Sequence, residues 1–162
     1  MICTEIDEAE ALRQLDRLTA ALSDLTPAMQ DVGEFLLAST EERYDAGVSP
    51  DGTPFAPKSP ATIERYRRGP DPVDIRPLFK SGTMRRTLHY EADATGVEVG
   101  SNAIQAAVMQ FGAEKGAFGS TEGGTPLPFG DIPVRPFIGL SDQDGTGIVA
   151  IVEEWLEGAV EG

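Results

Sequence analysis

One acidic stretch near the C-terminus has the residue spacing of a calcium-binding loop. The residues that match positions 1, 3, 5, 6, 7, 8 and 12 of the EF-hand pattern are Asp142, Asp144, Thr146, Gly147, Ile148, Val149 and Glu153. An EF-hand also needs a helix that enters the loop, and Pro133 and Pro136 exclude a helix just before this stretch. The prediction is therefore that the match is a decoy. We expect one of Ser141, Asp142 and Asp144 to cap a helix instead.

Other residue types that could support catalysis are sparse. His89 is the single histidine and lies in an expected strand, where a structural or surface role is more common than general-base work. Cys3 is the single cysteine and has no neighbouring base to activate it. The glycine-rich run at 116–130 lacks the Gly-Lys-Ser/Thr ending of a phosphate loop. The sequence predicts a non-enzymatic protein with no catalytic residue, no metal site and no cofactor.

Basic residues are concentrated in one segment of an acidic chain. The net charge is −14, yet Lys58–Arg86 holds eight basic and three acidic residues, which gives this segment +5 and leaves −19 for the rest. This division favours head-to-tail contact between copies, although two solvated faces of opposite sign would also explain it. The cluster Arg65–Arg68, interleaved with Tyr66, could contact nucleic acid. Because the pI is near 4.3, pairing between subunits is the favoured interpretation.

The elements that would carry these residues begin with an N-terminal helical segment, residues 1–47. Thr4 is a plausible N-cap, and leucines at helical spacing predict an amphipathic helix over 5–25. Thr26 and Pro27 have the residue types of a second helix start, and Gly47 is a candidate stop. We expect these helices to pack against a sheet, since the leucine repeat is short for a coiled coil.

The middle of the chain predicts one short helix and one hairpin. Ser59 and Pro60 can cap a helix that runs to Arg68. Residues 84–92 and 96–100 alternate between apolar and polar types, and 93–96 supplies the turn, so we expect a β-hairpin at about 84–100.

The remainder is expected to alternate short helices with loops. A short helix should follow Asn102 and end at Gly112, a mobile loop should occupy 113–130, and a last amphipathic helix should include 148–156 before a loose tail at 158–162. The fold class expected is α+β, with a small antiparallel sheet, helices from both ends packed on it, and long loops. Residues 48–157 form the expected core of what is a single domain overall.

The run IPVRPFIGLS at 132–141 is the most constrained stretch of the sequence. Pro133 and Pro136 fix φ and lack an N–H group, so the run is extended and cannot lie in the middle of a sheet. We expect an edge strand or a docking segment whose apolar residues pack under the final helix. Arg135 is expected to reach a carboxylate, in its own subunit or in the next.

Size and composition set the remaining limits. At 162 residues the chain is long enough to bury roughly two-thirds of its extended surface, but 18 glycines and 12 prolines predict many loops. No stretch approaches the roughly 20 apolar residues that span a bilayer, and MICTEIDEAE does not resemble a signal peptide. A soluble, unprocessed protein is expected. One cysteine suits a reducing cytoplasm.

Several short motifs occur here in the order typical of one protein family. They are Ser49-Pro50-Asp51-Gly52, Pro57, Leu78-Phe79, Ser81-Gly82 with Met84, Val97-Glu98-Val99-Gly100, Gln110-Phe111-Gly112 and the run at 132–141. Together they resemble the phage virion morphogenesis family, which includes tail completion proteins of contractile-tailed phages and the Mu-like G product. The similarity covers roughly Val48 to Leu156. The chain departs from the family pattern at Phe55, where tryptophan is usual, and at 105–112, which lacks the usual tyrosine and histidine.

The resemblance implies a non-enzymatic structural protein of the neck or tail end. Such a subunit would assemble in the host cytoplasm as a homo-oligomeric ring, a hexamer being favoured, that completes the tail and joins it to the filled head. Its partners would be tail tube and connector proteins. DNA would pass through the lumen without sequence-specific binding, and no membrane would be involved. Terminator, connector and assembly factor all remain open.

Two further alternatives and a set of interface residues complete the predictions. The chain could instead be a soluble chaperone or adaptor for tail or capsid components, or a calcium-dependent binding module. The expected subunit-interface residues are Arg65, Arg67, Arg68, Arg85, Arg86, Phe111, Arg135 and Phe137. An acidic lumen would let DNA slide past, because negative surfaces repel phosphate.

Overall fold

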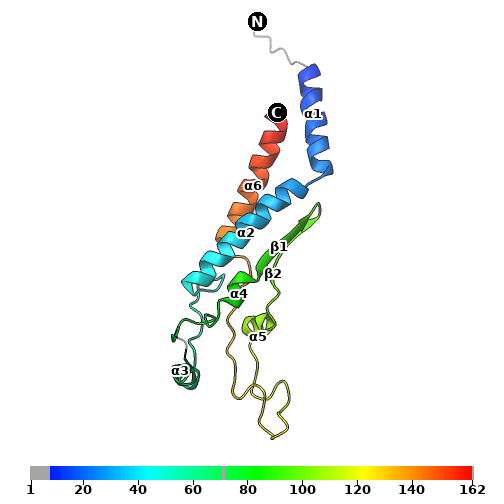
Figure 1. Cartoon of the computed structure of the whole chain (residues 1–162). Helices are drawn as coiled ribbons and strands as arrows, with labels where there is room; N and C mark the ends of the chain where they lie inside the picture. Colours follow the sequence, from blue (N-terminus) through cyan, green and yellow to red (C-terminus); the bar gives the residue numbers. More distant parts are fainter. Residues whose placement is uncertain (1–7, 71, 162) are drawn as a thin grey trace.

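The computed structural model describes residues 8–70 and 72–161, and its architecture is α+β as predicted. Three long helices gather toward one end of an elongated molecule, and α3 and the 113–131 segment extend from the other (Figure 1). The elements in chain order are α1 (Glu8–Ser23), α2 (Thr26–Ala46), α3 (Pro60–Arg67), α4 (Thr83–Arg86), β1 (Leu88–Asp93), β2 (Gly96–Ser101), α5 (Ala106–Phe111) and α6 (Asp142–Glu161). Thr4, the predicted first N-cap, lies outside the described residues.

Helix α2 carries a row of buried residues on one face, and the helix contacts both strands of the hairpin and α6. Every fourth residue is buried, namely Ala28, Val32, Leu36, Thr40 and Tyr44. Gly47 ends the helix in a left-handed conformation, with φ of 75°, and its N–H group donates to the carbonyl of Tyr44, as the predicted stop requires. The start differs slightly from the prediction, because Thr26 is the first helical residue and Asp24 accepts its N–H group at 2.9 Å.

The hairpin lies against α2. Its two strands pair antiparallel, with Leu88 opposite Ser101 at one end and Asp93 opposite Gly96 at the other. The Oδ1 atom of Asp93 accepts the N–H groups of Thr95 and Gly96 and so fixes the turn. A Cβ atom at Gly33 of α2 would lie 2.2 Å from Cδ2 of Tyr90, so the glycine allows β1 to approach closely.

The predicted hairpin began too early. Residues 83–86 form the helical turn α4, whose start is marked by Gly82 with a φ of 68°. The N–H group of Arg86 donates to the carbonyl of Gly82 at 3.1 Å, which closes the turn. The first strand therefore starts at Leu88.

The core is an aromatic cluster around Tyr44. The ring of Phe79 lies 5.1 Å from the Tyr44 ring, Phe137 lies 5.9 Å away and Phe55 lies 6.5 Å away. Met84, Leu88 and Ala106 are the other buried members of the cluster. Burial raises the pKa of Tyr44 to about 12, and its hydroxyl donates to the carbonyl of Leu78 at 3.2 Å. The cluster joins α2, the base of the hairpin and the 132–141 run.

Helices α1 and α6 lie side by side at the other end of the molecule (Figure 1). The Nη1 atom of Arg17 donates to the carbonyl of Val160 at 3.3 Å. No described residue of α1 is buried, and Leu12, Leu15 and Leu22 are each more than half exposed. Among the described helices, none is both long and apolar enough to cross a membrane.

The glycine-rich segment 113–131 folds back on itself as an arm. Ala113 and Ile132 pair at its base, where their N–H groups and carbonyls exchange hydrogen bonds of 3.0 and 2.7 Å. Further out, the N–H group of Phe118 donates to the carbonyl of Leu127 at 2.7 Å, and Thr121 donates to Thr125 at 2.8 Å. Main-chain hydrogen bonds therefore shape this arm, and its mobility stays a prediction.

Candidate interaction surfaces

The 132–141 run threads through the subunit as an extended segment. Beyond the pairing of Ile132 with Ala113, the described part of the run forms no strand. The main-chain partners of residues 135–138 come from α5. The N–H groups of Phe137 and Ile138 donate to Oε1 of Gln110 at 3.0 and 3.1 Å, and Nε2 of Gln110 donates back to the carbonyl of Ile138 at 2.8 Å. A side-chain amide thus replaces a neighbouring strand, which corrects the edge-strand alternative.

Arg135 anchors this run from within the subunit. Its Nε and Nη2 atoms donate to the carbonyls of Ala56 and Pro57 at 2.6 and 2.8 Å. Only 6% of the residue is exposed, and burial lowers the pKa of its guanidinium. Within the described residues of its own subunit, Arg135 bonds main-chain carbonyls and contacts no carboxylate, so the predicted pairing with a carboxylate of its own subunit is wrong. Its predicted role as an interface residue is corrected too, since it offers almost no surface to another copy.

Phe137 is likewise a core residue. It is 1% exposed, and its ring meets the edge of Tyr44 at an interplanar angle of 84°. The apolar side of the run therefore packs against the end of α2 and the base of the hairpin, not under α6 as predicted. This packing removes Phe137 from the candidate interface residues. Phe111, by contrast, is 75% exposed and keeps its candidate status.

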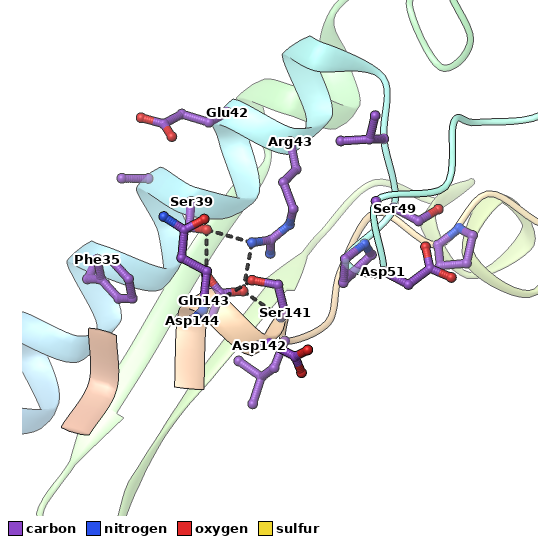
Figure 2. Close-up of a pocket in the computed structure, with 16 residues that line it drawn as sticks. Phe35, Ser39, Glu42, Arg43, Ser49, Asp51, Ser141, Asp142, Gln143 and Asp144 are labelled. Atoms are coloured by element: carbon purple, nitrogen blue, oxygen red, sulfur yellow. Dashed lines mark hydrogen bonds and ion pairs between the residues drawn. The ribbon is translucent and has the colours of Figure 1, made fainter. Parts of the chain in front are cut away.

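A buried ion pair joins α2 to the start of α6 (Figure 2). The Nη1 atom of Arg43 lies 2.7 Å from Oδ2 of Asp144, and the hydroxyl of Ser39 donates to Oδ1 at 2.5 Å. The N–H group of Ser141 donates to Oδ2 of Asp144 at 2.8 Å, and the N–H group of Asp144 donates to Oγ of Ser141 at 3.1 Å. This reciprocal pattern is a capping box, and it confirms that Ser141 caps the helix.

The electrostatics of Asp144 follow from these contacts. Burial alone would raise the pKa of its carboxyl group, since only 1% of the residue is exposed. Hydrogen bonds from Ser141 and Ser39, together with the charge of Arg43, reverse that effect and lower the pKa below its ordinary value. The carboxylate is therefore charged and internally neutralised.

The calcium pattern coincides with this helix start. Residues 142–153 all lie inside α6, so they cannot form the loop of an EF-hand, and the calcium-dependent alternative loses its site. Gly147, the glycine of the pattern, is a packing residue, because a Cβ atom there would lie 2.3 Å from Cζ of Phe35. Within the described residues, no group of three or more His, Cys, Asp and Glu side chains is placed to hold a metal ion.

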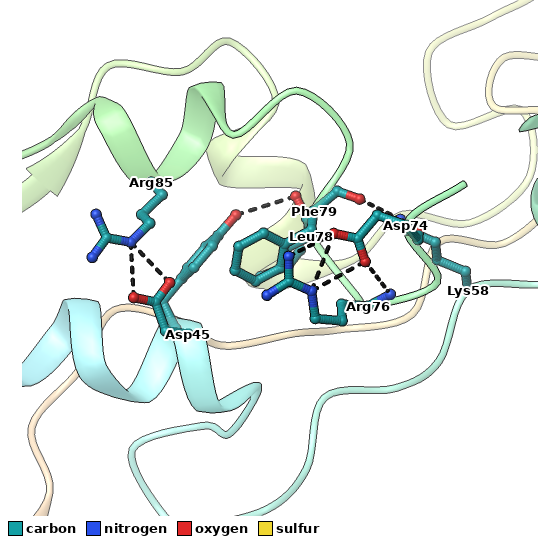
Figure 3. Close-up of polar contacts among 8 residues, drawn as sticks. Asp45, Lys58, Asp74, Arg76, Leu78, Phe79 and Arg85 are labelled. Atoms are coloured by element: carbon teal, nitrogen blue, oxygen red, sulfur yellow. Dashed lines mark hydrogen bonds and ion pairs between the residues drawn. The ribbon is translucent and has the colours of Figure 1, made fainter. Parts of the chain in front are cut away.

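Two arginines of the basic segment form ion pairs within the subunit (Figure 3). Arg85 contacts Asp45 at 2.8 Å and Glu41 at 3.3 Å, both on α2. Arg76 contacts Asp74 at 2.7 Å and lowers the pKa of that carboxyl group. Arg85 was predicted as an interface residue, but its nearest carboxylates belong to its own chain.

The rest of the basic segment faces solvent around α3. Arg65, Arg67, Arg68, Lys80 and Arg86 are all exposed. Arg67 and Arg68 share one carboxylate, Glu64, at 3.9 and 3.6 Å, and such exposed pairs contribute little to stability. Within the described residues, neither Arg65 nor Lys80 has an ion-pair partner, so the cations around α3 are available to bind an acidic surface.

Arg43 was not predicted as a partner of Asp144. It lies 101 residues away in the chain, and no local motif links the two residues. The Ser-x-x-Asp spacing of Ser141 and Asp144 was the one visible sign that the carboxylate faces the main chain.

Comparison with known proteins extends the resemblance to the N-terminal helices. The phage virion morphogenesis family model matches residues 6–157. Tail completion protein S of Escherichia phage P2 is 28% identical over 151 residues, which cover 88% of this chain and 94% of that protein. The Mu-like prophage FluMu G protein 2 of Haemophilus influenzae is 27% identical over 158 residues, which cover 97% of each. No solved structure matches. Since the family match spans α1 to α6, this chain belongs to the phage virion morphogenesis family.

Proposed function

We propose that this protein is a non-enzymatic structural subunit that completes the phage tail. Copies would assemble head to tail into a ring, a hexamer being favoured, which closes the end of the tail tube and joins it to the filled head. The name of the P2 relative, a tail completion protein, supports the place of action. That name does not extend to the ring or to the joining of tail and head, which we propose here.

The observation that carries the proposal is the separation of charge along the molecule. Helix α6 holds six acidic residues and no basic residue. The 58–86 segment has a charge of +5, and its helix α3 lies at the opposite end from the C-terminal half of α6 (Figure 1). A subunit with unlike ends favours heterologous contacts, and these generate rings when the rotation between neighbours closes.

The hairpin suggests how DNA could pass such a ring without binding. Glu91 and Glu98 lie directly opposite each other in the β1–β2 ladder, and both are exposed. Like charges at opposed positions destabilise a hairpin slightly, so folding alone does not explain them. An acidic surface of this kind on the lumen would repel phosphate, which fits passage without sequence-specific contact.

The proposal is tested by depleting the protein from a phage infection and by examining the purified chain. We expect depleted infections to yield filled heads and separate tails in electron micrographs, and the wild-type chain to restore joining. The purified chain should form closed rings, alone or on isolated tail tubes, and should be detected in finished virions by mass spectrometry. A chain that is required for tails but absent from finished virions would instead be an assembly chaperone.

A further inference from the structure

A groove between α3 and the arm at 113–131 is not filled by any described residue of the subunit. We propose that it receives the acidic helical end, formed by α1 and α6, of the neighbouring copy in the assembled ring. This inference rests on the proposed head-to-tail assembly and assigns it a contact.

The groove combines an apolar floor with a basic rim. Its volume is about 700 Å³, and it is lined by α3, the 78–84 segment and the arm. Its lining includes Lys58, Arg65, Tyr66, Lys80, Met109 and Phe129. Phe129 is 63% exposed, although it sits at the mouth of the groove. An exposed phenylalanine beside unpaired cations indicates a surface that another molecule covers.

The surface has a second hollow, which is separate from the groove. The groove beside α3 measures about 700 Å³, and the separate cleft beside Arg43 and Asp144 measures about 890 Å³. The groove is large enough to take several side chains of a partner. The cleft at the α2–α6 junction belongs to the ion pair described above and plays no part in the proposal.

Three cations of the groove surround one aromatic ring. Lys58 Nζ lies 5.1 Å from the centre of the Tyr66 ring, Lys80 Nζ lies 5.3 Å from it and the guanidinium carbon of Arg65 lies 5.7 Å from it. Lys58 also donates to the carbonyls of Asp74 and Phe79, so its position is fixed. Asp131 is the single carboxylate among the lining residues, and it accepts the N–H group of Lys115 at 2.8 Å. The rim is therefore strongly positive.

The opposite end of the molecule has the complementary character. Glu153, Glu157 and Glu161 follow one another at intervals of four along α6, so they form a row on one face of the helix, and all three are exposed. Like charges at this spacing destabilise a helix, so the stability of α6 alone does not explain the row. None of the three has an ion-pair partner among the described residues. The adjacent helix α1 adds its exposed leucines to this end.

A second copy fits the groove better than DNA does. Helix α3, which lines the groove, and the C-terminal half of α6, which carries the acidic row, lie at opposite ends of one subunit (Figure 1). The row and the groove can therefore meet only between copies. A contact between unlike ends is heterologous, as ring closure requires. DNA would meet three cations in the groove but a charge of −19 outside the 58–86 segment.

A charge exchange tests the contact with the full-length chain. We expect Lys80→Glu and Glu157→Lys each to weaken self-association at least about tenfold, because like charges then face each other, and the double variant to restore much of it. Lys115→Glu is the matched control, since Lys115 is an exposed cation outside the groove lining. Association is measured by light scattering, or by retention on isolated tail tubes, and circular dichroism checks that each variant is folded.

The outcomes separate the contact from the proposed function. If the single variants associate like the wild type, or the double variant shows no recovery, the contact is wrong while ring assembly stands. If Lys80→Glu abolishes binding of a short labelled DNA duplex and leaves association intact, the groove is a DNA site and the inference is overturned. If the wild type stays monomeric both in solution and on tail tubes, the proposed function itself fails.

Discussion

Arg43 on α2 and Asp144 in the first turn of α6 form a buried ion pair, with 2.7 Å between Nη1 and Oδ2. The contact fixes where α6 starts relative to α2, because the same carboxylate accepts the N–H group of Ser141. Arg43 also donates to the carbonyl of Gly139 at 2.9 Å, so it holds the end of the 132–141 run as well. One guanidinium on α2 thus holds both the end of the 132–141 run and the start of α6, which lie 96 and 101 residues further along the chain.

Replacing Arg43 by methionine should destabilise the subunit strongly. The change leaves Asp144 buried without its charged partner, and such a loss costs about 3–5 kcal/mol of unfolding free energy. Urea unfolding of the purified chain measures it. Arg13→Met is the matched control, since the Arg13–Glu10 pair is exposed and should contribute less than about 1 kcal/mol. Equal losses in the two variants would contradict the structural role of the buried pair.

The stability contributed by Asp144 should depend on pH in the acid range. Its pKa is lowered in the folded chain, so its contribution is complete above the unfolded value of about 3.9 and is lost as pH falls through the folded value. Asp144→Asn removes this titration. The difference in unfolding free energy between wild type and variant should therefore be constant near neutral pH and should shrink below about pH 4. A difference that grows on acidification would reverse the assigned sign.

Replacing Arg135 should lower the free energy of unfolding, while assembly of the folded variant should change little. Arg135→Lys keeps the positive charge but loses the forked geometry that reaches the carbonyls of Ala56 and Pro57. We expect a loss of about 1–3 kcal/mol in unfolding free energy. Assembly measured under conditions where the variant is still folded should be close to normal. Lys115→Ala, in the arm, should change neither quantity, and a folded Arg135→Lys variant that fails to assemble would restore Arg135 as an interface residue.

Gly33 should tolerate no side chain while Tyr90 is present. Gly33→Ala places a methyl group against the Tyr90 ring and should cost about 1–3 kcal/mol through overpacking. The same substitution in a Tyr90→Ala background should cost much less, because the opposing ring is gone. A double-mutant cycle of thermal or urea unfolding measures this coupling. Additive effects would show that Tyr90 does not limit the approach of β1 to α2.

Glu98→Lys should stabilise the hairpin and still impair the phage, if the hairpin faces the lumen of the proposed ring. The new lysine faces Glu91 across the ladder and should stabilise the hairpin by about 0.2–1 kcal/mol. If this surface lines the proposed lumen, phage carrying the variant should nevertheless eject DNA more slowly or form fewer plaques. Glu122→Lys, on the exposed arm, is the control for a change of net charge. Normal plating of Glu98→Lys phage would place the hairpin away from the lumen.

Local signals predicted some boundaries of elements, because they act within a few residues of the chain. Ser59 caps α3 by accepting the N–H group of Thr62 at 3.2 Å, and Gly112 ends α5, both as expected. Two others were wrong, since α6 continues to Glu161 where a loose tail was expected from 158, and α5 begins at Ala106 and not directly after Asn102. The start of the hairpin was misplaced, since alternation over 84–87 resembles a strand while Gly82 and the hydroxyl of Ser81 favour a helical turn.

Contacts between distant segments were not predictable in the same way. The guanidinium of Arg135 reaches carbonyls 78 and 79 residues away, and a sequence pattern does not indicate which main-chain groups will lie near a buried cation. Phe137 was assigned to an interface for a similar reason. An apolar residue in an extended run packs inward or outward depending on whether an aromatic cluster forms beside it, and here Tyr44 provides one.

The lack of buried residues in α1 has a consequence for how the subunit behaves before assembly. A helix that buries so little should open far more readily than α2, and its amides should exchange with solvent through local rather than global unfolding. In the free subunit, α1 is therefore held only weakly against the rest of the fold. In the proposed ring, contacts that cover the leucines of α1 would add stability when a subunit is incorporated and would slow its dissociation.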